Sequence, residues 1–218
     1  MIKLKYGNWQ NITIAVYDKL KGLKDDEINT QEDELNVNIK LLSILCDVTE
    51  DEISNLPLTE FSKLIEQTAF LKDMPKYEIE TRYKVGNQTY DVQTNIRAMT
   101  TAQFIDFQTL SKEQDKNFAN LLACFLIPKG KKYGDGYDII EVAEYLYNNM
   151  SIATARSIMF FFTLQYQALQ KVILTYSIKQ LKKEMRKTRN EEARAQLAMA
   201  IQQMTQLKTL IQNGVGYI

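Results

Sequence analysis

The chain of 218 residues contains no histidine, and this absence excludes several kinds of catalytic and metal-binding chemistry. Imidazole is the usual general base near neutral pH, the usual partner of a serine or cysteine nucleophile, and the commonest transition-metal ligand. The two cysteines, Cys46 and Cys124, are too few and too far apart for a structural zinc site. Paired acids such as Asp25 and Asp26 follow no pattern that marks a pocket. The sequence therefore predicts a protein that is not an enzyme, with no catalytic residue, no cofactor and no metal site.

A glycine-rich stretch, KGKKYGDGYD at residues 129–138, would bind phosphate or calcium only if its spacing were right. It lacks the GxxxxGK[ST] spacing of a phosphate-binding loop, and no strand is expected before it. Asp135 and Asp138 do not follow the regular acidic ligand spacing of an EF-hand. We therefore interpret the stretch as a solvated connecting loop, which could still touch a partner.

A basic run between residues 179 and 189 is the best candidate for contact with nucleic acid. Its main members are Lys182, Lys183, Arg186, Lys187 and Arg189. Glutamates are interleaved with the run and adjacent to it, and no aromatic residues alternate with it to stack on bases. The chain has 27 Lys or Arg and 27 Asp or Glu, so no global positive field attracts nucleic acid or an anionic membrane. A solvated helix face is the favoured interpretation.

Both cysteines lie in apolar helical contexts, LLSILCDV and NLLACFLIP, which are typical of buried free thiols. They make no disulfide framework, which suits a reducing cytosol. The first residues, MIKLKYGNWQ, contain no apolar signal core and no cleavage site, so secretion is not expected. The single tryptophan, Trp9, is expected to anchor this N-terminal segment by packing.

The hydrophobic patterns predict an α+β fold that is predominantly helical. Residues 77–96 alternate polar and apolar side chains around the turn VGNQ, which predicts a β-hairpin. Helical spacing on both sides, with a capping box at Thr49 and Glu52, predicts a compact helical body over residues 1–150. One of these helices is expected to end at Pro128.

The most apolar stretch, SIMFFFTLQYQALQKVILTY at residues 157–176, is not expected to cross a membrane. A membrane span needs about 20 apolar residues in a row, and here three glutamines and Lys171 interrupt the run. Apolar residues fall on several faces of the expected helix, which indicates that it is covered on several sides. It is either a central core helix or a core helix that also meets a neighbouring subunit.

Residues 151–218 are expected to form one very long helix or, as we favour, a helical hairpin broken near residues 187–190. The second part carries a stripe of apolar residues spaced three or four apart: Leu197, Ile201, Met204, Leu207 and Ile211. This spacing is typical of a narrow seam between two helices. The stripe either folds back on the helix before it or packs against another chain. In the second case these five residues are the candidate partner-binding site.

Three short patterns follow one another along the chain. W-x-x-I-T-x-x-x-Y lies at residues 9–17, S-I-L…T-x-x-E-I…L-P-L at residues 43–58, and T-x-x-Q-F-I-D at residues 100–106. In this order the chain resembles small tail-morphogenesis proteins of tailed bacteriophages, including the crAss-like phages of gut bacteria. The resemblance covers roughly residues 1–170 and leaves out the C-terminal helical extension.

The resemblance implies a structural component of the virion neck or tail, such as a ring, connector or baseplate part. The alternative is a tail assembly chaperone that is absent from the mature virion. The partners would be other phage structural proteins and copies of the chain itself in a homo-oligomer. The protein would be located in the virion after assembly in the host cytoplasm. A DNA-binding or packaging accessory protein is the third hypothesis.

Overall fold

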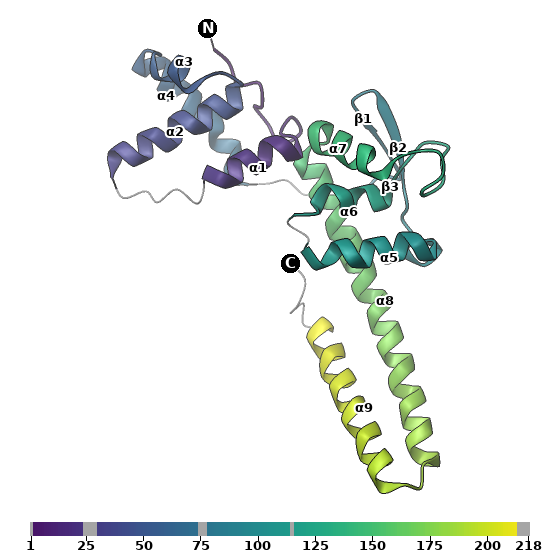
Figure 1. Cartoon of the computed structure of the whole chain (residues 1–218). Helices are drawn as coiled ribbons and strands as arrows, with labels where there is room; N and C mark the ends of the chain where they lie inside the picture. Colours follow the sequence, from purple (N-terminus) through teal and green to yellow (C-terminus); the bar gives the residue numbers. More distant parts are fainter. Residues whose placement is uncertain (1, 24–29, 74–77, 114–115, 213–218) are drawn as a thin grey trace. The chain divides into compact units, whose positions relative to one another are not determined.

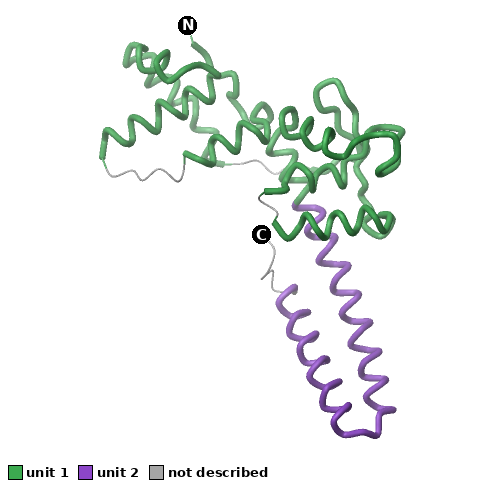
Figure 2. Tube along the Cα trace, in the orientation of Figure 1, with its two compact units in different colours: residues 1–159 green, residues 160–218 purple. Residues whose placement is uncertain are grey.

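A computed structural model of the chain describes residues 2–23, 30–73, 78–113 and 116–212. It confirms the predicted fold class, because the chain is mostly helical with one small antiparallel sheet and a long C-terminal helix (Figure 1). Two compact units are present, residues 1–159 and residues 160–218 (Figure 2). The sequence places a division after residue 150, whereas the units divide inside helix α8 (Ile152–Lys187).

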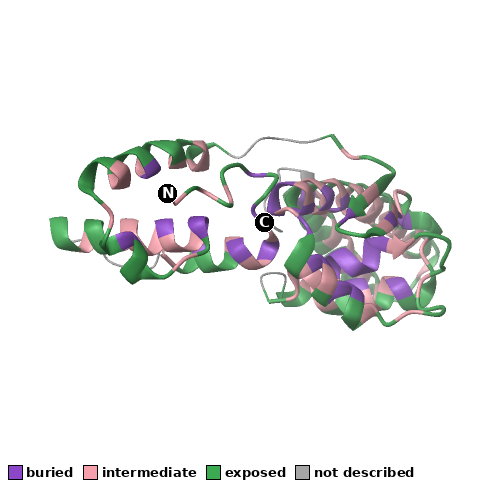
Figure 3. Cartoon of the chain, turned by 90° about the horizontal axis from the view of Figure 1, so that it is seen from above, coloured by how far each residue is buried: buried purple, intermediate pink, exposed green. Residues whose placement is uncertain are grey.

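The described residues between 14 and 72 are mostly helical. Their helices are α1 (Ile14–Gly22), α2 (Gln31–Cys46), α3 (Glu50–Ser54), α4 (Leu58–Gln67) and the 3-10 helix η2 (Thr68–Lys72). An apolar cluster joins α2, α3 and α4 through the buried side chains of Leu42, Cys46, Ile53 and Leu64. Buried and exposed positions alternate along the helices in Figure 3, as the spacing of amphipathic helices requires.

Capping boxes that begin with a threonine fix where α2 and α3 begin. The predicted capping box is present at α3, where the Glu52 amide donates to Thr49 Oγ1 at 3.3 Å and the Thr49 amide donates to the Glu52 carboxylate at 2.9 Å. These bonds hold the pKa of Glu52 below its ordinary value. Thr30 and Asp33 make the same reciprocal pair at the start of α2. Each box satisfies helix-end amides that have no partner inside the helix.

The predicted hairpin is present, but it is shorter than expected and belongs to a three-stranded sheet. Strand β1 (Arg82–Val85) pairs antiparallel with β2 (Gln88–Val92), and β2 pairs antiparallel with β3 (Leu126–Pro128). Tyr90, at the centre of β2, is fully buried. The strand order β1-β2-β3 leaves β1 at one edge of the sheet.

The expectation that a helix continues to Pro128 is wrong, because α6 (Phe118–Phe125) ends before strand β3. A proline disfavours helical geometry at the residue before it, here Ile127. The backbone groups of this segment find partners in and beside β2 instead. The Gln93 amide donates to the Phe125 carbonyl at 2.8 Å, and the Lys129 amide donates to the Thr89 carbonyl at 2.9 Å.

Helix α6 is the centre of the second half of this unit. It packs against α5 (Thr101–Leu110) and α7 (Ile139–Asn149). Leu121, Leu122 and Phe125 of α6 are fully buried together with Leu146 of α7. Thr100 begins α5 with another capping box, whose second member is Gln103.

A short backbone pairing joins the N-terminal segment to the beginning of α8. Thr13 and Ser151 form an isolated antiparallel bridge. The Ile152 amide donates to the Ile12 carbonyl at 2.8 Å, and the Ile14 amide donates to the Met150 carbonyl at 3.1 Å. This pairing places α1 beside α7.

The second unit is a helical hairpin. Helix α8 ends at Lys187, and α9 (Glu191–Gln212) runs back antiparallel to it after a turn of residues 188–190 (Figure 1). Asn190 caps α9 by accepting a hydrogen bond from the Ala193 amide at 3.1 Å. Within the described ranges, no helix is long and apolar enough to cross a membrane.

We predict that the hairpin turn depends on the contact between Gly86 and Tyr145. Gly86 has a φ of +55°, and a Cβ there would lie 2.5 Å from the Tyr145 hydroxyl. That hydroxyl accepts from the Asn87 amide at 3.1 Å and donates to the Val85 carbonyl at 3.2 Å. Gly86→Ala should lower the free energy of unfolding by about 1–3 kcal/mol, measured by urea denaturation.

Gly134→Ala is the matched control, because Gly134 has a φ of +70° but open space where a Cβ would stand. It should cost less than Gly86→Ala. Tyr145→Phe removes the hydroxyl and the clash together, so the double variant Gly86→Ala/Tyr145→Phe should cost less than the sum of the two single variants. Strict additivity would contradict the proposed contact.

Candidate functional site

The candidate partner-binding residues all lie on α9, but they do not share one environment. Leu197, Ile201 and Met204 are half-buried and Ile211 is buried, whereas Leu207 is 48% exposed. Lys208, the next residue along the helix, is half-buried where Leu207 was expected to be. Among the covered positions of α9, residues 197, 201, 204, 208 and 211 are spaced alternately by four and three residues, so helix geometry places Lys208 in the stripe and turns Leu207 outward.

Helix α8 shows the matching pattern on its second half. Leu174, Ile178, Leu181 and Met185 are half-buried and are spaced four, three and four residues apart. Because the two helices lie side by side and antiparallel in Figure 1, we infer that these two stripes cover one another. The contact is narrow, since most of its residues remain partly exposed.

A second set of large apolar side chains on this hairpin lies outside the seam. On α8, Val172, Ile173 and Tyr176 are between 50% and 63% exposed, and on α9 Met199, Leu207 and Leu210 are between 47% and 63% exposed. We call these six residues the outer apolar set. Helix geometry turns the three residues of each helix away from its seam stripe, so the set gives an exposed apolar face on α8 and another on α9. Exposed apolar faces are typical of interaction sites.

The basic run lies at the closed end of the hairpin. Lys182, Lys183, Arg186 and Lys187 end α8 and Arg189 lies in the turn, and all five are exposed. Residues 160–218 carry nine Lys or Arg and three Asp or Glu, a formal net charge of +6. Residues 1–159 carry 18 and 24, a formal net charge of −6. The formal net charge of zero for the whole chain is therefore the sum of two units of opposite net charge.

A polar cluster surrounds the Cys124 thiol at the C-terminal end of α6. The Tyr133 hydroxyl lies 3.7 Å from Cys124 Sγ and donates to Asp106 Oδ2 at 2.9 Å. The buried side chain of Gln103 donates to the Cys124 carbonyl at 2.6 Å. Burial raises the pKa of Cys124 to about 11 and also raises the pKa of Tyr133. Burial therefore favours the protonated thiol at neutral pH, which is a weaker nucleophile than the thiolate.

The glycine-rich loop brings no metal ligands together. Asp138 begins α7 by accepting from the Ile140 amide at 2.8 Å, which is a capping role. Gly130, Gly134 and Gly136 have positive φ angles and shape the loop. Among the described residues, no group of three or more cysteine and acidic side chains could hold a metal ion.

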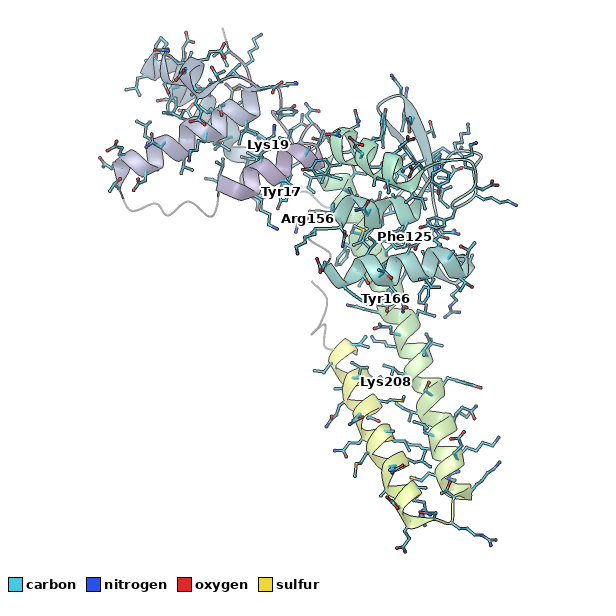
Figure 4. All side chains as sticks on the ribbon, in the orientation of Figure 1. Tyr17, Lys19, Phe125, Arg156, Tyr166 and Lys208 are labelled. Atoms are coloured by element: carbon cyan, nitrogen blue, oxygen red, sulfur yellow. The ribbon has the colours of Figure 1, made fainter. Side chains whose placement is uncertain are left out.

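A hollow of about 400 Å³ opens beside Trp9, and we call it the Trp9 pocket. Apolar side chains from α1, α2, η2 and residue 23 line it, together with the aromatic rings of Trp9 and Tyr17. Lys21, Lys72 and Arg156 are its charged lining residues. Figure 4 shows Arg156 and Tyr17 near one another, and Arg156 Nη1 donates to the Tyr17 hydroxyl at 3.3 Å.

The sequence identified Trp9 as an anchor, and the structure agrees. The Trp9 indole donates to the carbonyls of Phe70 and Asp73 at 2.8 and 2.9 Å. The pocket around it was missed, because its lining residues come from segments far apart in sequence and none stands in a motif. The single tryptophan is the only signal that pointed there.

Comparisons with known proteins identify no relative: no family model, no curated protein and no solved structure matches the chain. The resemblance to phage tail proteins therefore depends on the three sequence patterns alone. In the structure, residues of those patterns are anchors and caps, such as Trp9, Thr49 and Gln103. These roles stabilise the fold and do not identify a biochemical activity.

We predict that Cys124 makes the protein less stable at alkaline pH. Its folded pKa of about 11 lies above the ordinary value of 9.0. Below that ordinary value the thiol is protonated in both states, and as pH rises toward the folded pKa only the unfolded chain ionises. The free energy of unfolding should fall by about 2–3 kcal/mol over this interval on account of Cys124.

Urea denaturation at several pH values would measure this loss in the native chain and in Cys124→Ala. The variant should lose less stability over the same pH interval, whatever its stability at neutral pH. Equal losses in the two proteins would show that the thiol is not protected from ionisation by the fold.

Proposed function

We propose that the protein is a non-enzymatic structural component of a bacteriophage neck or tail, which acts by packing against other protein chains. The outer apolar set carries this proposal. It consists of six of the large apolar side chains that stay about half-exposed on the hairpin, and it lies outside the stripes along which we infer that the two helices cover one another. The three sequence patterns shared with phage tail proteins support the phage part of the proposal.

The partners include other copies of this chain. A ring requires each copy to use two different surfaces, so that one contact repeats around a closed symmetry. The outer apolar set offers exposed apolar faces on α8 and on α9, and strand β1 at the edge of the sheet offers a further surface that could extend a neighbour's sheet. The site of action would be the virion, after assembly in the host cytoplasm.

An assembly chaperone that leaves before the particle is finished would use the same surfaces. Mass spectrometry of purified virions separates the two roles. A structural component is present in the virion in a fixed ratio to the other tail proteins, whereas a chaperone is absent.

A DNA-binding or packaging accessory protein is the second candidate function. The net charge of +6 on residues 160–218, with five exposed Lys and Arg at the closed end of the hairpin, favours it. Such binding would weaken steeply with salt, because each phosphate contact releases a bound counterion. No binding to duplex DNA at low salt in a fluorescence titration would eliminate this candidate.

We predict that Val172→Asp and Leu207→Asp each weaken self-association by about tenfold or more, because a carboxylate would enter an apolar contact. Both residues are exposed in the single chain. Their unfolding midpoints should therefore stay close to that of the native chain. Size-exclusion chromatography with light scattering measures the association.

Ile201→Asp is expected to differ, because Ile201 is half-buried in the seam and the charge should destabilise the hairpin itself. Gln202→Asp is the matched control, since Gln202 is exposed and polar on the same helix. The outer apolar set is not the interface if Val172→Asp and Leu207→Asp associate as the native chain does. A chain shortened to end at Lys187 should also lose association, because α9 is missing.

A further inference from the structure

The Trp9 pocket has the lining that binds an apolar group. Leu20, Leu41 and Leu71 come from three different segments and line it together with Trp9. The two hydrogen bonds of the indole to backbone carbonyls satisfy its polar atom and hold the ring in place. A fixed aromatic ring in a mostly apolar hollow of about 400 Å³ fits the usual description of a small-ligand site.

The charged side chains of the pocket are all of one sign. Lys21 belongs to α1, Lys72 to η2 and Arg156 to α8, so three separate elements each contribute a cation. No aspartate or glutamate is among the described lining residues. This is the reverse of the surroundings, because residues 1–73 carry eight Lys or Arg and 14 Asp or Glu, a formal net charge of −6.

Arg156 is held against the aromatic wall. Its guanidinium carbon lies 5.9 Å from the centre of the Tyr17 ring, and its Nη1 donates to the Tyr17 hydroxyl. The Tyr17 ring in turn lies 6.4 Å from the Trp9 ring, centre to centre. A cation, a phenol and an indole therefore follow one another along one wall of the pocket.

We propose that the Trp9 pocket binds an organic anion that carries an aromatic or branched apolar group. The apolar group would lie against Trp9 and the leucines, and the anionic group would face Lys21, Lys72 and Arg156. Neither part of the lining alone selects this ligand, because the apolar surface is neutral and the cations would attract any anion. The inference depends on the pocket alone and is independent of the proposed phage role.

Trp9 fluorescence can report this binding directly, because Trp9 is the only tryptophan in the chain. The probe is N-acetyl-phenylalanine, which joins an aromatic ring to a carboxylate. Two matched probes test the contributions of the charge and of the ring separately. N-acetyl-phenylalaninamide lacks the charge, and acetate lacks the ring. We expect N-acetyl-phenylalanine to bind with a Kd on the order of 1 mM, which suits a ligand of its size, and about tenfold more tightly than its amide.

Substitutions test the three cations. Lys21→Gln, Lys72→Gln and Arg156→Gln should each weaken the binding of N-acetyl-phenylalanine by several fold and leave the binding of the amide unchanged. The control is Lys19→Gln, because Lys19 lies on the same helix as Lys21, two residues away, and is not among the residues that line this pocket. It removes the same charge and should leave binding unchanged.

The source of the anion is tested with two capped dipeptides, N-acetyl-Asp-Phe-amide and N-acetyl-Asn-Phe-amide. Preferred binding of the aspartyl peptide would assign the pocket to an acidic segment of a partner protein. Binding of the free carboxylate alone would assign it to a small molecule or a chain terminus.

Any of three results would overturn the proposal. The amide could bind as tightly as the acid, or Lys19→Gln could weaken binding as much as Lys21→Gln. The absence of any fluorescence change, together with no heat in calorimetry at ten times the expected Kd, would also overturn it.

Discussion

The fold of residues 1–159 depends on one backbone pairing between segments that are far apart in sequence. The carbonyl of Ile12 and the amide of Ile14 bond to Ile152 and Met150, at the junction of α7 and α8. All four of these side chains are almost fully buried, so the pairing lies in the core. Buried backbone groups must be paired, and here each segment provides the partners of the other. This pairing also brings Arg156 to Tyr17 and so completes the Trp9 pocket.

Helix α8 serves two different parts of the protein. Its first turns contribute the buried residues Ile152, Ala155 and Ile158 to the core of the larger unit. Its second half carries a seam for α9 on one face and exposed apolar residues such as Val172 and Tyr176 on another. A helix that is apolar on several faces needs several neighbours. The proposed role in assembly follows from the fact that one of these faces remains exposed in the single chain.

The opposite charges of the two units add a second constraint on association. Residues 160–218 have a net charge of +6 and residues 1–159 a net charge of −6. Such a separation favours partners or copies that meet through unlike surfaces, and it makes association sensitive to salt. The Trp9 pocket departs from the acidic character of its own region, which is why its three cations carry an inference of their own.

The sequence by itself determined the fold class, the capping box at Thr49, the hairpin turn and the buried state of both cysteines. These features are local, because periodicity, turn residues and caps act over a few neighbouring residues. Only the tertiary structure decided that residues 126–128 form a strand, because their partners in β2 lie more than 30 residues earlier. It also decided which face of α9 is covered, so that Lys208 lies in the stripe and Leu207 turns outward although Leu207 is the more hydrophobic residue. The Trp9 pocket was beyond sequence reasoning for the same reason, since its walls come from α1, α2, η2 and α8 and meet only when the chain is folded.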